Sequence, residues 1–217
     1  IQVQAANVLL GSQNLVAVLG IVTAIGSMVS MAICPILIKK LGEKKVYLIM
    51  SFYGFAVSVL SFIVGFLWFR NPDNMMLTVL FYLFLFIIGL QFGAVTLMPM
   101  IMTADCVDYY EYETGKRMEG AAYSVLTLTI KVCLALGTAL GLVFVQFSGY
   151  SDTVAQITAG TAAGFDVGTK DIIFFAYTVM PGILALLSTI PMFKYDIVGE
   201  KKAKIASELA VRREAKD

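Results

Sequence analysis

Five carboxylates and two cations lie close together in the segment from residue 103 to residue 120, TADCVDYYEYETGKRMEG. The carboxylates are Asp105, Asp108, Glu111, Glu113 and Glu119. Two carboxylates can carry out general acid–base hydrolysis, but such a site needs a pocket that positions the water between them. The same pattern is also typical of a set of ion pairs, or of a solvated charged loop.

The spacing of the carboxylates favours ion pairs over hydrolysis. Residues three and four apart share one face of a helix, so Asp105, Asp108 and Tyr112 lie on a common face if the helix continues through them. We expect this face to reach a membrane surface that is rich in cations. The predicted partners of the carboxylates are Lys44, Lys45 and Arg117.

A lysine follows inside the next apolar run. Lys131 lies about 20–25 Å along a helix from either end of that run, too far for its ammonium group to reach the membrane surface comfortably. A charge in the middle of a membrane costs at least about 2.5–3.5 kcal/mol. We therefore expect Lys131 to face a polar cavity or a carboxylate, and a purely structural ion pair is the alternative. Small and polar residues share its helix face: Ser124, Thr127, Ala135 and Thr138.

The preceding apolar run also contains polar and small residues. Gln91 and Thr96 are able to hydrogen-bond a polar ligand, and Pro99 is expected to kink the helix and free a backbone carbonyl. Gly89 and Gly93 have two interpretations, since they suit either a ligand site or a close contact between two helices.

Enzyme chemistry finds little support in the composition. The chain has no histidine, which excludes Ser-His and Cys-His nucleophile pairs and histidine metal sites. Cys34, Cys106 and Cys133 lack the paired spacing of metal or disulfide sites, and we interpret them as packing residues. We predict a protein that is not an enzyme and carries no metal or cofactor.

The elements that position these residues are predicted to be membrane helices. Hydrophobic residues make up 59% of the 217 residues and charged residues only 14%, whereas soluble domains have about 45–50% and about 25%. Net charge is +1, which gives no reason to expect a nucleic-acid partner. The sequence begins at Ile1 without a basic segment and cleavage site, so we expect no signal peptide and a start inside a longer protein.

Five apolar runs are long enough to cross a bilayer as helices, and a sixth helix is cut short. Residues 1–11 are predicted to be the end of this truncated helix, and residues 14–193 form the bundle. The predicted spans are 15–38, 46–69, 75–102, 121–147 and 172–193.

The cations are distributed unequally between the two sets of loops. One set, with the tail, holds thirteen, and the other holds only Arg70 and Lys170. The positive-inside rule places the richer set in the cytoplasm. This set comprises Lys39, Lys40, Lys44, Lys45, Lys116, Arg117, Lys194, Lys201, Lys202, Lys204, Arg212, Arg213 and Lys216.

Residues 194–217 form a charged tail that is predicted to be cytoplasmic. Glu200–Lys204 and Glu208–Arg212 are spaced for ion pairs one helical turn apart. We expect a short solvated helix here, and a helix that binds lipid or a partner is the alternative.

The segment MTADCVDYYEYETGKRMEGAAYSVLTLTIK resembles the signature of the glycoside–pentoside–hexuronide:cation symporters, a group within the major facilitator superfamily. PILIKKLGEKK resembles the loop between the eighth and ninth helices of that fold. The resemblance extends from about residue 14 to the tail. It implies an all-α membrane protein: the C-terminal six-helix bundle of a major facilitator superfamily transporter, with its first helix truncated.

The resemblance also implies roles for residues. Lys131 and Thr127 match positions that line the sugar cavity of the melibiose permease. Leu126 stands where that permease has a glutamine, and Thr96 where it has a tryptophan against the sugar. Asp105, Asp108 and Arg117 match a cytoplasmic charge network that closes the inner gate.

The implied function is sugar symport with Na⁺ or H⁺ by alternating access, in the inner or plasma membrane. The implied partners are a sugar, the coupling cation, the lipid bilayer and an N-terminal half that holds the cation-binding carboxylates. Two alternatives stay open: a non-transporting sensor or scaffold, and a major facilitator transporter for another solute.

Overall fold

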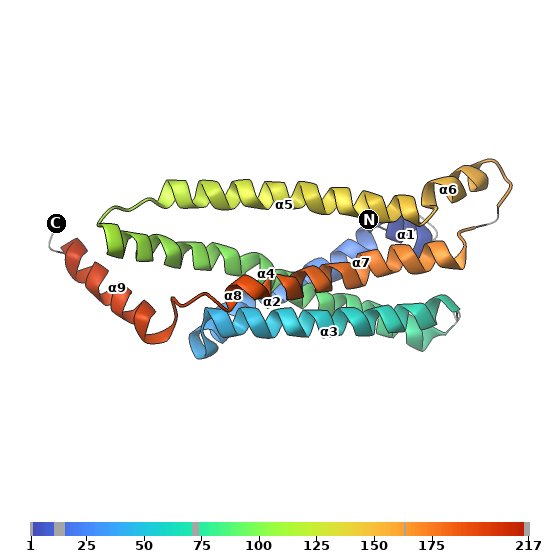
Figure 1. The fold of residues 1–217 in the computed structure, drawn as a ribbon. Coiled ribbons are helices and arrows are strands. Elements are labelled where there is room, and N and C mark those ends of the chain that lie inside the picture. The colour runs from blue at the N-terminus through green and yellow to red at the C-terminus, as the bar shows by residue number, and fades with distance from the viewer. Residues whose placement is uncertain (1, 11–15, 71–73, 163, 215–217) are drawn as a thin grey trace.

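A computed structural model describes residues 2–10, 16–70, 74–162 and 164–214, and this part of the chain is helical with no strand. Figure 1 shows long helices lying side by side, with short helices at both ends of the bundle. The helices are α1 (Gln2–Leu10), α2 (Val16–Leu41), α3 (Glu43–Arg70), α4 (Met75–Thr114), α5 (Glu119–Phe147), α6 (Tyr150–Thr158), α7 (Val167–Leu187), α8 (Thr189–Met192) and α9 (Gly199–Glu214).

Within the described residues, five helical segments are long and apolar enough to cross a membrane: α2, α3, α4, α5, and α7 together with α8. They overlap the predicted spans with different ends, and the expected starts of the bundle at Asn14 and of its first span at Leu15 lie outside the described residues. The main difference is α4, which continues to Thr114 instead of ending near residue 102. The carboxylates at 105–113 therefore lie on this helix, as the shared face of Asp105, Asp108 and Tyr112 required.

The ends of the helices follow from their capping residues. Asn74 begins α4, and its side chain accepts a hydrogen bond from the Met76 backbone N–H at 3.1 Å. Gly115 ends α4 with φ +71°, a conformation that glycine adopts without strain, and its N–H donates to the Glu111 carbonyl. Asp166 caps α7 in the same way as Asn74 caps α4, through Gly168.

Glycines allow α2 and α4 to approach closely. A Cβ added at Gly89 would lie 2.4 Å from the Thr23 carbonyl oxygen, and one at Gly93 would lie 2.3 Å from the Ser27 oxygen. Gly26 is equally close to the α4 backbone at Phe86. Of the two interpretations of Gly89 and Gly93, the structure therefore places both at a helix–helix contact.

A second stripe of small residues lets α3 pack against α4 and α7. Gly54 makes room for the side chain of Gln91, and Gly65 makes room for the ring of Phe174. Phe174, Phe81 and Trp68 form an aromatic core near the end of the bundle that holds the α3–α4 connection, with Trp68 and Phe81 stacked at 4.6 Å between centroids. These contacts bind α2, α3, α4 and α7 into one unit.

Helix α5 lies at the edge of this unit (Figure 1). Only Gly141 and Val145 are buried within it, while large apolar side chains such as Leu134 and Leu136 are 69% and 60% exposed. One side of α5 is therefore open along most of its length.

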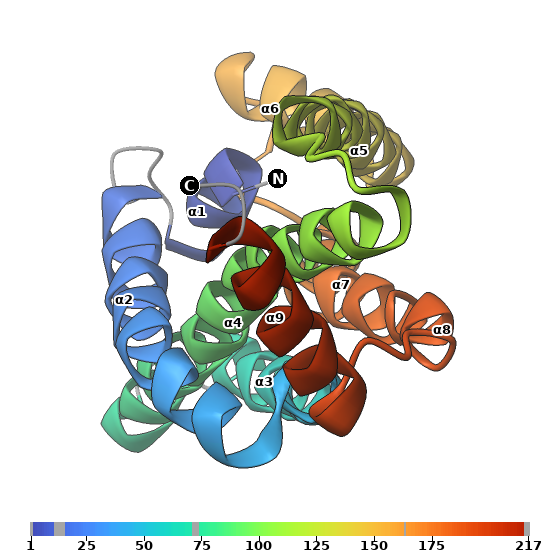
Figure 2. The ribbon, with the colours of Figure 1, turned by 90° about the vertical axis from the view of Figure 1, so that its left-hand side faces the viewer.

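The two ends of the bundle differ in character. The connection at 148–170 contains the short helix α6, which lies near α1 (Figure 1). At the other end, α9 lies across the bundle in front of α4 and α3 (Figure 2). This second end consists of the α2–α3 turn, the C-terminus of α4, and α9. We call it the charged end.

Candidate functional site

Lys131 lies on an open face of α5. It lines a recess of about 430 Å³ together with Gly120, Tyr123, Ser124, Thr127 and Leu128. At 1.5 Å per residue, Lys131 is about 18 Å from the start of α5 and about 24 Å from its end. Its charge therefore lies near the middle of a helix that is long enough to cross a bilayer.

The hydroxyl groups beside Lys131 are held in place by their own helix. The Ser124 hydroxyl donates to the Gly120 carbonyl at 2.7 Å, and the Thr127 hydroxyl donates to the Tyr123 carbonyl at 2.8 Å. A hydroxyl that donates in this way keeps lone pairs that can accept a hydrogen bond from a ligand. We call this surface, made of Tyr123, Ser124, Thr127 and Lys131, the Lys131 face.

No described side chain neutralises Lys131, because its ammonium group makes no ion pair or hydrogen bond within residues 2–10, 16–70, 74–162 and 164–214. A lysine ammonium has three donor hydrogens and no acceptor. Such a group suits a ligand rich in oxygen atoms, or a carboxylate from another part of the protein.

The other residues predicted for the cavity lie elsewhere. Thr138 is two helical turns beyond Lys131, outside the recess, and bonds to the Leu134 carbonyl. Gln91 is only 3% exposed, with its amide against Gly54 inside the bundle. Thr96 is exposed on α4 and donates to its own helix at the Phe92 carbonyl. Gln91 and Thr96 are on α4, and Thr138 lies on the same side of α5 as Lys131 but beyond the recess.

Tyr123 is a residue of the recess that the pattern of charges did not indicate. It lies eight residues before Lys131, two turns away on the same face, and its hydroxyl donates to the Met100 carbonyl of α4 at 3.4 Å. The available signal was this spacing, which repeats that of Thr127 and Lys131.

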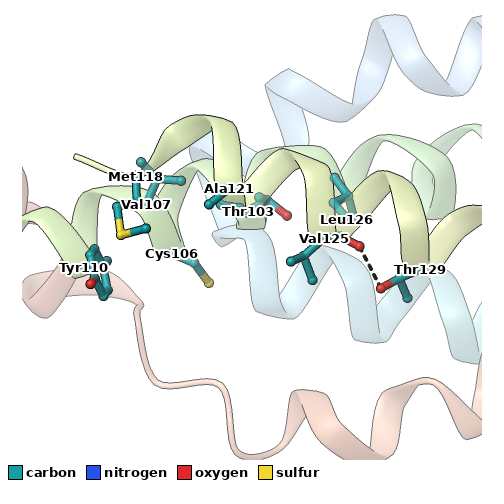
Figure 3. A pocket seen from close by; sticks show the side chains of 10 residues that line it. Thr103, Cys106, Val107, Tyr110, Met118, Ala121, Val125, Leu126 and Thr129 are labelled. Carbon is teal, nitrogen blue, oxygen red and sulfur yellow. Dashed lines mark hydrogen bonds between the residues drawn. The ribbon is translucent and has the colours of Figure 1, made fainter. Parts of the chain in front are cut away.

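A separate groove of about 630 Å³ lies between α4 and α5 and is mostly apolar. Figure 3 shows Thr103, Cys106, Val125, Leu126 and Thr129 around it. Leu126 thus lines this groove, while its neighbour Thr127 lines the recess. Consecutive helical residues point about 100° apart, which explains the separation.

Two groups of charged residues lie at the charged end. In the first, Arg213 of α9 contacts Glu111 at 2.6 Å and Asp108 at 3.1 Å, and Arg117 contacts the same two carboxylates at 3.0 and 3.2 Å. We call these four residues the Arg213 cluster. Both arginines and Asp108 are between 43% and 46% exposed, so each of these pairs is partly solvated.

The second group is more buried. Lys202 of α9 contacts Glu43 at 2.6 Å and Asp105 at 2.7 Å, and the Tyr195 hydroxyl donates to Asp105 at 3.2 Å. We call these four residues the Lys202 cluster. The Asp105 side chain is only 9% exposed. Burial lowers the pKa of Lys202, but the hydrogen bonds to Asp105 and Glu43 outweigh it, so this pKa lies above its ordinary value.

Tyr195 stays a hydrogen-bond donor in this cluster. Burial, and then the nearby Asp105 carboxylate, raise the pKa of its phenol well above the ordinary value. The hydroxyl therefore keeps its proton and satisfies one lone pair of Asp105.

Comparison with known proteins identifies the family of the chain. The model of the family described as MFS/sugar transport protein matches residues 5–199. The chain belongs to this family. It is accordingly a multi-pass membrane protein of the major facilitator kind. The comparison with solved structures gives no match.

Three relatives illustrate this sugar transport family. The inner membrane symporter YicJ of Escherichia coli is 31% identical over 121 residues, which cover 56% of this chain and 25% of that protein. A putative sulfoquinovose importer of Escherichia coli is 25% identical over 217 residues, 100% of this chain and 42% of that protein. A glucuronide carrier protein homolog of the same organism is 26% identical over 192 residues, which cover 87% of this chain and 37% of that protein. The chain spans less than half the length of these relatives.

The charged residues that we expected to pair are only partly brought together. Asp108 and Arg117 are in contact, as described above. Asp105 pairs with Lys202 instead of Lys44, whose ammonium donates to the Phe193 and Tyr195 carbonyls at 3.0 and 2.7 Å. Lys45 is exposed and has no ion pair within the described residues. Asp105 and Asp108 have these partners because α9 folds back onto α4 and brings Lys202 and Arg213 to its carboxylates.

The tail of this family member is also less solvated than predicted. One face of α9 is buried through Ile205 and Leu209, which pack with Tyr109, Tyr112 and Tyr195. Arg212 lies over the Tyr112 ring at 5.2 Å and donates to the Tyr112 carbonyl. The predicted helix is present, but it is not solvated on all sides. Ile205 and Leu209, four residues apart on α9, pack against tyrosines of α4.

Proposed function

We propose that this chain is the C-terminal half of a sugar:cation symporter that works by alternating access. The observation that carries the proposal is Lys131, a charge without a described partner in the middle of a membrane helix, beside hydroxyl groups in an open recess. Ionisable residues inside a membrane usually mark a substrate or ion pathway. The sugar transport family and the names of the relatives support the same function.

In this proposal the Lys131 face contacts the sugar. Ser124 and Thr127 accept hydrogen bonds from sugar hydroxyls, and the Lys131 ammonium donates. The names of two relatives refer to sugars that carry an anionic group, sulfoquinovose and glucuronide. An acidic sugar would supply the negative charge that Lys131 lacks among the described residues, so we place such sugars first among the substrates to test.

The remaining parts of the transporter follow from the same proposal. The coupling cation, Na⁺ or H⁺, binds carboxylates of an N-terminal half, which forms the other wall of the sugar site. Gln91, Thr96 and Thr138 contribute indirectly, through helix packing or farther along the pathway. The protein lies in the inner or plasma membrane with the charged end and residues 194–217 in the cytoplasm, in agreement with the cation count.

Asp108 and Arg117 belong to an inner gate at the charged end. Asp105 serves the same gate by holding its helices in place through Lys202, while Lys44 and Lys45 are available to carboxylates of the N-terminal half. Partly solvated ion pairs suit a gate because they can break and re-form at a cost of about 1 kcal/mol each. The closed gate has water excluded on one side, which strengthens the pairs.

The decisive experiment is uptake of labelled sugar by the full-length protein in membrane vesicles, with neutral and acidic sugars compared. We expect Lys131→Leu to lower uptake at least about 100-fold, because removing a charged hydrogen bond to substrate costs several kcal/mol. Lys40→Leu, at the exposed end of α2, is the control and should retain uptake. Normal uptake by Lys131→Leu would leave Lys131 with a structural role. Absence of sugar uptake in the wild type, with uptake of another solute, would favour a transporter of a different substrate class.

A further inference from the structure

Helix α9 touches both charged clusters, and it does so through side chains on one of its faces, since Lys202 and Arg213 are three helical turns apart. Lys202, near the start of α9, belongs to the Lys202 cluster, and Arg213, near the end of α9, belongs to the Arg213 cluster. Between them, Ile205 and Leu209 are 4% and 2% exposed against tyrosines of α4. Figure 2 shows α9 running across the end of the bundle.

Lys202 joins two helices that otherwise meet with like charges. Glu43 is the first residue of α3, and Asp105 lies in the C-terminal part of α4. Both carboxylates contact the same ammonium nitrogen, and both are largely buried, at 13% and 9% exposed. Two carboxylates held this close repel each other unless a cation lies between them. Tyr195 satisfies one oxygen of Asp105 but supplies no charge.

We propose that Lys202 is a positioning residue for the inner gate: by bridging Glu43 and Asp105 it fixes the end of α4 that carries the Arg213 cluster. This inference rests on the proposed function, because it assigns the role of a gate to that cluster. Asp108 and Glu111 lie one and two turns beyond Asp105 on α4. Their location relative to α3 is therefore set by the Lys202 cluster.

The two clusters differ in a way that suits a division of roles. The Lys202 cluster has three charges from three separate elements, and its two carboxylates are only 13% and 9% exposed. In the Arg213 cluster Glu111 is 14% exposed, but Asp108 and both arginines are 43–46% exposed, so its pairs open more easily. Loss of one member from a buried cluster leaves an uncompensated charge, which is far more disruptive than loss of an exposed pair. Lys202 therefore holds the helices while the Arg213 cluster opens and closes.

The test uses the full-length transporter with its native cysteines replaced and Thr127→Cys as a reporter in the recess. Labelling from the cytoplasmic side reports opening of the gate. We expect Lys202→Gln to raise the labelling rate at least about threefold, because the closed state loses its internal bridge. Trypsin cleavage at Arg212 and Arg213 should accelerate by a similar factor as α9 leaves the bundle.

Two further variants make the test specific. Lys204→Gln is the matched control, since Lys204 is 68% exposed and only reaches Glu208 at 3.8 Å. It should behave as wild type. Adding Asp105→Asn to Lys202→Gln removes the more buried of the two uncompensated carboxylates, and we expect labelling and cleavage to return part of the way to wild type.

The outcomes separate this inference from the proposed function. Unchanged labelling and cleavage in Lys202→Gln, or no recovery on adding Asp105→Asn, would overturn the role of Lys202. If the wild type moves no sugar, the proposed function fails, while labelling and cleavage still report whether Lys202 positions α4.

Discussion

At the scale of single residues, the Lys131 face combines a cation with hydroxyl groups at helical spacing. Ser124, Thr127 and Lys131 all line one recess, and each is on α5. Their types and spacing could be recognised in the sequence because a helix brings residues four apart to one face without help from the rest of the fold. The cation that pairs with Asp105 could not be recognised in this way, since Lys202 is 97 residues away in the chain.

Thr127 lines the recess and Thr129 lines the α4–α5 groove, so we expect substitutions of these two threonines to differ in their effect on sugar affinity. Thr127→Val removes an acceptor from the proposed sugar site and should weaken sugar affinity about 5- to 30-fold, which corresponds to about 1–2 kcal/mol for one hydrogen bond. Thr129→Val is an equivalent change, since its hydroxyl also bonds to a carbonyl of its own helix at 2.8 Å, but it faces the groove. It should leave affinity unchanged. Competition binding measures both, and equal effects would contradict the assignment of the recess.

At the scale of helices, close packing depends on glycines at particular points. Gly89 meets the α2 backbone, whereas Gly137 on α5 has open space around it. Both are mid-helix glycines in an apolar sequence, so local pattern does not distinguish them. The difference arises because α4 is central and α5 is peripheral.

Alanine at these two glycines should have opposite effects on stability. Gly89→Ala places a methyl group against the Thr23 carbonyl and should destabilise the protein by about 1–3 kcal/mol, as overpacking usually does. Gly137→Ala should be neutral or stabilising by up to about 1 kcal/mol, because alanine favours helix and nothing obstructs it. Thermal unfolding in detergent measures both variants. A stable Gly89→Ala would contradict the close α2–α4 contact.

At the scale of the whole molecule, the loops at the two ends of the bundle differ in charge. Lys116 follows α4 at the charged end, and Thr161 follows α6 at the other end; both residues are exposed. Each lies next to a glycine with positive φ, Gly115 or Gly160, where a new side chain would be strained. The neighbouring exposed positions are therefore better sites for probes of orientation.

Cysteine labelling tests the proposed orientation. On a background without native cysteines, an impermeant reagent added to intact cells should label Thr161→Cys and leave Lys116→Cys unlabelled until the membrane is opened. The expectation follows from the excess of cations at the charged end. The reverse pattern would place the charged end outside and remove the basis for an inner gate there.

The sequence by itself determined the class of the protein, the five apolar helices and the hydroxyl-rich face of Lys131. Those features depend on hydrophobicity and on the 3.6-residue repeat, which act over one or two turns of chain. Only the tertiary structure decided that Gln91 is buried against Gly54, that Leu126 and Thr127 face different spaces, and that α9 returns to α4. Each of these depends on which helix lies beside which. The apolar patterns of the five spans are alike on all sides, so the choice of neighbours is made by the fit of side chains across helices and not by any one segment.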